Sequence, residues 1–214
     1  MGEFPGRPVV QKGALIVYAD QSPGSKPSRQ IIFQYNPETL KRSFAMRQPA
    51  RDPAKQTQAQ EDVLSVPGPP VETITLTIEL DAADQLDNPT HADDVNDNGL
   101  HGALAALELL LYPSTALISQ IEQQADAGAV QVHPGDTPLV LLAWGAARVV
   151  PVQITSLSVS EELFDPMLNP ISAKVDLGLK VLTYMEFTKA SVGRDTFIAF
   201  QKKKEQLAAQ WVGA

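Results

Sequence analysis

Two long segments of the sequence alternate between apolar and polar residues. In residues 71–80, and again in residues 171–183, almost every second side chain is apolar. Successive side chains of a β-strand point to opposite faces, so this period of two predicts strands with one buried and one exposed face. The apolar set is Ile74, Leu76, Ile78 and Leu80 in the first segment, and Ile171, Ala173, Val175, Leu177, Leu179 and Val181 in the second. The pattern therefore favours a mainly β fold.

Shorter segments extend this pattern. Residues 13–19 and 29–35 are rich in β-branched and aromatic residues and are separated by a loop of turn-forming residues, which predicts a hairpin. Residues 139–144 form another apolar strand. In residues 148–159 the apolar phase shifts, which predicts a bulge near 155–156. We expect this strand to pair with residues 171–183 as one long hairpin.

Two helices are predicted between the strand-rich parts. Residues 99–112 carry leucines at helical spacing, with Asn98 as the expected N-cap and Pro113 as the stop. Ser114 is expected to cap a second helix that ends near Gly128.

Composition excludes several functional classes. The chain has 214 residues, of which 43% are apolar, so a sizeable core can form. The net charge is −8, from 17 basic and 25 acidic residues, and argues against a nucleic-acid partner, which needs a basic face. The sequence contains no cysteine, which excludes disulfides and thiol nucleophiles. No apolar run approaches the roughly 18 residues that predict a membrane span.

The expected domain organisation has three parts. Residues 1–12 form an N-terminal arm, residues 13–190 a β domain, and residues 191–214 a C-terminal helix. The β domain contains two insertions, an exposed loop at 45–70 and an acidic loop with helices at 81–137. The fold class is mainly β (α+β), either two packed antiparallel sheets or a partly open β-barrel with flanking helices.

One acidic segment resembles the start of a calcium-binding loop. Asp94, Asn96, Asn98 and Gly99 fill the first ligand positions and the glycine position of an EF-hand. The last position, which needs a bidentate glutamate, is Ala105. The alternative that we favour is a solvated loop whose carboxylates lie at the start of the next helix.

No other metal or catalytic pattern stands out. The histidines, His91, His101 and His133, have no metal-ligand spacing, and no nucleophile elbow or phosphate-binding loop is present. We therefore predict no catalytic residue, no metal site, no cofactor and no enzymatic activity.

Two elements carry a recognisable pattern. Residues 31–40 form a strand that leads into an Asn-Pro turn and a short helical start, because Pro37 cannot continue a sheet ladder. Residues 139–145 form an apolar strand that ends in Trp-Gly. The residues of the pattern are Phe33, Gln34, Tyr35, Asn36, Pro37, Glu38 and Leu40 in the first element, and Trp144 and Gly145 in the second.

In this order, the two elements resemble the signature of tube-like proteins from contractile injection systems, the phage-tail-like machines of bacteria. The resemblance brackets residues 13–184, with 45–70 and 81–137 as divergent parts. It implies two packed antiparallel sheets with a flanking helix, assembled as a hexameric ring that stacks on the inner tube. The protein would then be a structural part of the machine.

The resemblance also suggests a position in the particle. Longer members of the family carry a LysM module and act at the baseplate hub, whereas this sequence ends in a single helix. We therefore expect an adaptor ring at the cap end of the inner tube, in contact with the tube protein, the cap and possibly the sheath. The alternative is a baseplate hub adaptor that joins the tube to the hub and spike proteins. The expected location is the bacterial cytoplasm, within an assembled particle, with release of that particle as an open alternative.

The C-terminal segment has two interpretations. Residues 195–211 are helical in pattern, with a seam formed by Phe197, Phe200, Leu207 and Trp211. The seam either packs within the chain or contacts a partner subunit as a helix in a groove. A calcium- or glycan-binding β-sandwich is a distant alternative for the whole chain.

Overall fold

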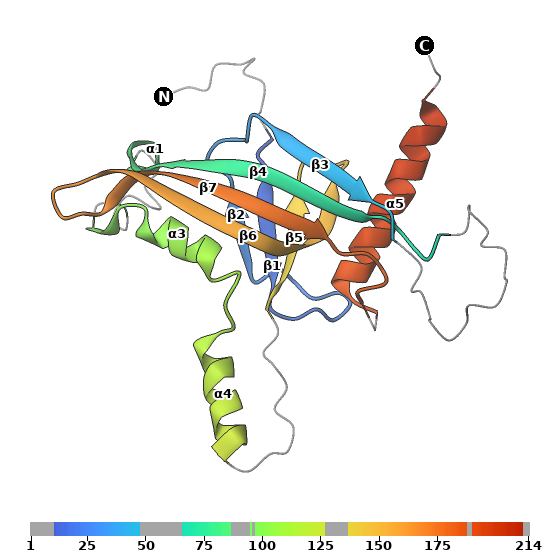
Figure 1. Cartoon of the computed structure of the whole chain (residues 1–214), viewed down its shortest axis with the longest axis horizontal. Helices are drawn as coiled ribbons and strands as arrows, with labels where there is room; N and C mark the ends of the chain where they lie inside the picture. Colours follow the sequence, from blue (N-terminus) through green and yellow to red (C-terminus); the bar gives the residue numbers. More distant parts are fainter. Residues whose placement is uncertain are drawn as a thin grey trace, which may run out of the picture.

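A computed structural model describes residues 11–47, 66–86, 95, 97–126, 137–187 and 190–211. Within these residues, seven strands form one antiparallel sheet in the order β2-β1-β5-β6-β7-β4-β3 (Figure 1). The strands are β1 (Ala14–Tyr18), β2 (Arg29–Ile32), β3 (Leu40–Ala45), β4 (Val71–Asp81), β5 (Leu139–Ala143), β6 (Val149–Phe164) and β7 (Pro170–Val181). The helices are α1 (Ala82–Leu86), α3 (His101–Glu108), α4 (Thr115–Asp126) and α5 (Val192–Gln210).

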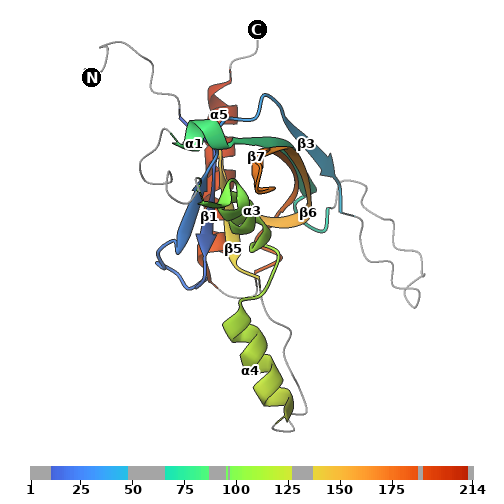
Figure 2. The ribbon, with the colours of Figure 1, turned by 90° about the vertical axis from the view of Figure 1, so that its left-hand side faces the viewer.

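The mainly β fold with flanking helices is therefore confirmed. In the described part of the chain, all strands belong to one sheet, which curves strongly but is not closed, because its edge strands β2 and β3 do not pair (Figure 2). Of the two arrangements expected from the sequence, the partly open one describes this sheet.

The core follows the alternation seen in the sequence. Inward positions of β4 and β7, such as Ile74 and Leu179, are fully buried. Helix α3 lies across the open side of the sheet and buries Leu104 and Leu107 (Figure 2). Helix α5 packs against β6 at the other end of the long hairpin. The two helices thus cover parts of the core that the sheet leaves open.

The long β6–β7 hairpin contains the expected bulge. The register between the two strands shifts between Ile154 and Ser156, which confirms the prediction from the apolar phase. Gly178 lies opposite this bulge, and a side chain there would overlap the hydroxyl of Ser156. The glycine therefore allows the two strands to stay close where the ladder is irregular.

The helical start expected after Pro37 is wrong. The chain has no helix there, and β3 begins at Leu40 and pairs with β4. β3 lacks an apolar alternation because its inward position is filled by Arg42, which forms an ion pair with the buried Glu72 at 2.7 Å. The Arg42–Glu72 ion pair takes the place of an aliphatic residue, whose presence would have given β3 a recognisable alternation.

The helix boundaries are partly as expected. Ser114 caps α4 by accepting a hydrogen bond from the Leu117 amide at 3.2 Å, as predicted. The N-cap of α3 is Leu100 and not Asn98, and no side chain caps it. This helix ends at Glu108, before Pro113. None of the described helices is long and apolar enough to cross a membrane.

Candidate functional site

The Asn-Pro turn carries the chain from one edge of the sheet to the other. Asn36 accepts a hydrogen bond from the Gly13 amide at 2.8 Å and donates one to the Gln11 carbonyl at 2.9 Å. The Asn36 side chain therefore acts as a strand partner for the residues that precede β1. Pro37 follows directly, where the backbone turns away toward β3.

Gln34 joins the two sides of the open sheet. Its amide nitrogen donates to the Asp81 carbonyl at 2.8 Å, and its amide oxygen accepts from the Asp81 amide at 3.0 Å. Asp81 is the last residue of β4, whereas Gln34 follows the edge strand β2. One side chain thus supplies the pair of hydrogen bonds that a strand residue would supply in a closed barrel.

The two halves of the signature meet around one glycine. The Phe33 and Trp144 rings lie with their centroids 6.4 Å apart, tilted by 52°. A β-carbon on Gly13 would lie 2.8 Å from both rings, so only glycine fits beneath them. Gly145 then turns the chain with a φ of 69°. The sequence singled out both halves but gave no sign of Gly13.

Tyr35 is held by a carboxylate. Its hydroxyl donates a short hydrogen bond to Asp84 of α1, and this bond raises the pKa of Tyr35 to about 12. Leu40, the last residue of the signature, pairs with Leu76 at the start of β3. The signature residues therefore brace the fold through contacts within the chain.

The C-terminal helix is divided into a buried and an exposed half. Ser191 caps α5 by accepting from the Arg194 amide at 3.2 Å. Phe197 and Phe200 are each only 6% exposed, whereas Leu207 and Trp211 are 46% and 76% exposed. The first half of the seam therefore packs within the chain, whereas its second half faces outward, and its contact with a partner subunit stays a prediction.

A charged cluster lies where α5 meets the sheet. Burial lowers the pKa of Lys204, and Glu72 and Arg42 lie close enough to act on it. Burial also lowers the pKa of Arg148, next to the same two residues. The Lys204 amine lies 4.5 Å from the centroid of the Phe200 ring, a cation–π contact. Phe200 and Lys204 are one helical turn apart, so this contact lies within α5.

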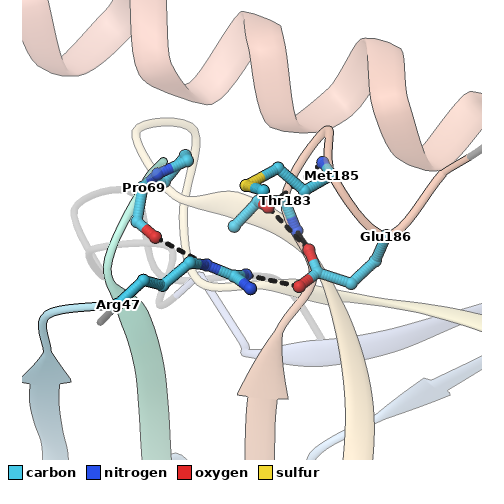
Figure 3. Close-up of polar contacts among 5 residues, drawn as sticks. All are labelled: Arg47, Pro69, Thr183, Met185 and Glu186. Carbon is cyan, nitrogen blue, oxygen red and sulfur yellow. Dashed lines mark hydrogen bonds and ion pairs between the residues drawn. The ribbon is translucent and has the colours of Figure 1, made fainter. Parts of the chain in front are cut away.

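Arg47 ties together three segments at the same end of the molecule (Figure 3). Its guanidinium donates to the Pro69 carbonyl at 2.8 Å and forms a short ion pair with Glu186. Glu186 also accepts from the amide and the hydroxyl of Thr183, at 2.7 and 2.6 Å. This Arg47 clamp, which the sequence did not reveal, joins the ends of residues 48–65 to the turn before α5.

The titratable side chains form no candidate metal centre within the part of the chain that the structure describes. No three His, Cys, Asp or Glu side chains gather there as metal ligands. Asp94 and Asn96 of the suspected calcium loop, as well as His91 and His133, lie outside the described residues. Ala105 is an exposed residue of α3.

Comparison with known proteins gives one result. The family model for the contractile injection system tube protein matches residues 9–187. No curated protein matches the chain. The matched range contains the whole sheet and both halves of the signature, and ends before α5 begins at Val192.

Proposed function

Because the chain belongs to the family of contractile injection system tube proteins, we propose that it is a structural adaptor at one end of the inner tube. Copies of the chain form a ring, which we expect to be hexameric. The ring stacks on the tube protein and joins it to the cap. Its role is structural and involves no catalysis or cofactor, and it acts in the bacterial cytoplasm as part of the assembled particle.

The division of α5 carries this proposal. The helix lies beyond the matched range of 9–187, so it is an addition to the tube-type body. Phe197 and Phe200 anchor it to the sheet, and the charged cluster holds it there. One end of the helix is fixed to the sheet, and the other end is exposed and apolar. Such a helix is suited to bind in a groove of a second protein.

Trp211 and Leu207 are the residues that we assign to this contact. Large apolar side chains near the centre of an interface often dominate its binding energy, and tryptophan is the most enriched of them. Helix α4 is a second candidate contact, since it stands away from the body and leaves Ile118 exposed (Figures 1 and 2). We propose that α4 reaches the cap or the sheath.

Cryo-electron microscopy of whole particles tests the proposal. We expect density for this chain between the last ring of the inner tube and the cap, with Trp211 against a neighbouring protein. Density at the baseplate alone would assign the chain to the hub and spike instead. Absence from both ends of the tube would overturn the adaptor proposal.

Variants of α5 make the test specific. Leu207→Asp and Trp211→Asp together should remove the cap from the tube end while the ring stays in place. Gln206→Asp with Gln210→Asp is a matched control, because it also adds two charges to the exposed half of the same helix. Loss of the cap with the control as well would show that charge alone disturbs assembly.

A further inference from the structure

The turn of the β6–β7 hairpin exposes an apolar surface that no described part of the chain covers. We call it the apolar tip, and it consists of Leu163, Phe164, Met167 and Leu168. Met167 and Leu168 are 81% and 77% exposed, and the other two are at least half exposed. Single exposed apolar residues are common, but four together at a protruding turn indicate a contact surface.

The tip is held in one conformation. Asp165 accepts from the amides of Met167 and Asn169 at 2.7 and 2.8 Å, and from the Asn169 side chain at 2.9 Å. Leu163 and Leu168 have φ angles of 55° and 67°, a region that leucine rarely adopts. Strain of this kind persists only where the surroundings impose it, and it is concentrated at functional sites. The turn thus presents its apolar side chains in a fixed arrangement.

The same chain also contains a cleft with an apolar lining. It lies between the edge strand β2 and α3 and has a volume of about 650 Å³, which is within the roughly 300–1,000 Å³ of typical binding sites. We call it the β2–α3 cleft, and its apolar lining includes Ile31, Ile32, Leu80, Ala103, Ala106 and Leu107. The small side chains of Ala103 and Ala106 leave room along α3.

The two surfaces are complementary in charge. Among the described residues that line the cleft, Lys12 and Arg29 are basic and Asp84 is the one carboxylate. Glu161 and Glu162 flank the tip on β6, and one lysine, Lys174, lies 3.5 Å from Glu162. The acidic groups beside the tip therefore attract the mainly basic cleft. Two tips, or two clefts, carry charges of the same sign and repel each other.

A tip cannot enter the cleft of its own chain. The first residue of β7, directly after the turn, is bonded to the residues before α3: the Leu100 amide donates to the Pro170 carbonyl at 2.9 Å. Asn169 also donates to the Asp97 carbonyl at 3.4 Å. These bonds hold the hairpin turn beside the residues before α3, and the turn projects away from β2, which lines the cleft together with α3 (Figure 1). A filled cleft therefore needs a second copy.

We propose that the apolar tip of one copy docks in the β2–α3 cleft of the next copy. The contact joins two different surfaces, so it repeats from copy to copy and forms a ring when the rotation between copies closes. This inference rests on the ring in the proposed function, and it names the surfaces that form the ring.

Cross-linking tests the contact directly. The sequence has no cysteine, so engineered thiols are the only ones. A Met167→Cys chain mixed with a differently tagged Ala103→Cys chain should form a mixed disulfide on mild oxidation. Ala208→Cys, on the exposed half of α5, replaces Ala103→Cys as the control and should not cross-link. Peptide mass spectrometry identifies the linked pair.

Charge and apolar variants give a second measurement. Met167→Asp with Leu168→Asp should weaken association by about tenfold or more, since each change puts a carboxylate where the cleft would bury an apolar side chain. Ser160→Asp, exposed on the same hairpin, should not. Arg29→Glu should weaken association, and Glu161→Lys in the same chain should restore it.

The outcomes separate this inference from the proposed function. Rings that form without the Met167–Ala103 cross-link, and that tolerate the tip variants, overturn the tip-to-cleft contact and leave the ring proposal standing. Copies that form no ring, alone or on tube ends, overturn both. A cross-link in assembled rings, lost in the tip variants, supports both.

Discussion

At the scale of single residues, Gln34 replaces a missing strand pairing. Its side chain exchanges two hydrogen bonds with the backbone of Asp81 across the open side of the sheet. Gln34→Ala removes both bonds, and we expect the free energy of unfolding to fall by about 1–3 kcal/mol. Gln34→Glu keeps an acceptor for the Asp81 amide but places a carboxylate against the carbonyl, so it should not restore stability. Urea denaturation measures both, and unchanged midpoints would contradict this role.

Glu186 makes the Arg47 clamp sensitive to pH. Burial acts to raise the pKa of Glu186, but hydrogen bonds from Thr183 and Arg47 outweigh it, so the pKa lies below the ordinary 4.5. A carboxyl whose pKa is lowered by folding stabilises the folded state fully above its unfolded pKa, and this contribution is lost as pH falls through the folded pKa.

The stability difference between the wild-type chain and Glu186→Gln should therefore depend on pH. We expect the wild type to be more stable at about pH 7, and the difference to shrink on acidification to about pH 3. Denaturant titrations at both pH values measure this difference. Glu161→Gln, exposed on β6, is the control and should show a small difference throughout. A difference for Glu186→Gln that is constant with pH would show that the clamp does not depend on the carboxylate charge.

At the scale of elements, α5 contains a glycine, Gly193, at a position where close packing leaves no room for a side chain. Replacing a glycine with alanine inside a helix usually raises the free energy of unfolding by up to about 1 kcal/mol. A β-carbon on Gly193, however, would overlap the ring of Phe187. We therefore expect Gly193→Ala to lower the thermal midpoint, and Phe187→Leu to recover part of the loss in the double variant. A higher midpoint for Gly193→Ala would mean that the turn before α5 can move aside.

The elements that the sequence predicted best are those whose packing is purely apolar. β4 and β7 followed from alternation, and the bulge near Ser156 followed from a change of apolar phase. β3 could not be predicted, since its inward Arg42 is neutralised by a glutamate 30 residues away. A sequence pattern shows which residues are apolar, but not which charges are paired.

The candidate site shows the same limit. The signature from Phe33 to Leu40 could be singled out, but its role as a brace depends on Gly13 and Asp81, which are distant from their partners Asn36 and Gln34 by 23 and 47 residues. Such partners are set by the curvature of the sheet, which no local pattern encodes. The apolar tip was likewise visible only as a turn, because exposure is a property of the folded chain.

At the scale of the whole molecule, the family-matched body and α5 are joined by one apolar anchor. Residues 9–187 match the family, but Phe197 and Phe200 of α5 belong to the buried core cluster of the body. The helix therefore has a structural half and an outward half. The two halves can be separated by truncation.

Ending the chain after Lys204 removes Leu207 and Trp211 but keeps both buried phenylalanines and the contacts of Lys204. We expect this variant to unfold with nearly the wild-type midpoint, because it loses mainly exposed surface. Ending the chain after Ala190 also removes the anchor, and removing a buried phenylalanine typically costs about 3–5 kcal/mol. That variant should unfold at a much lower temperature or fail to fold. Calorimetry of the two truncated chains measures this contrast, and equal midpoints would mean that the family-matched body is stable without α5.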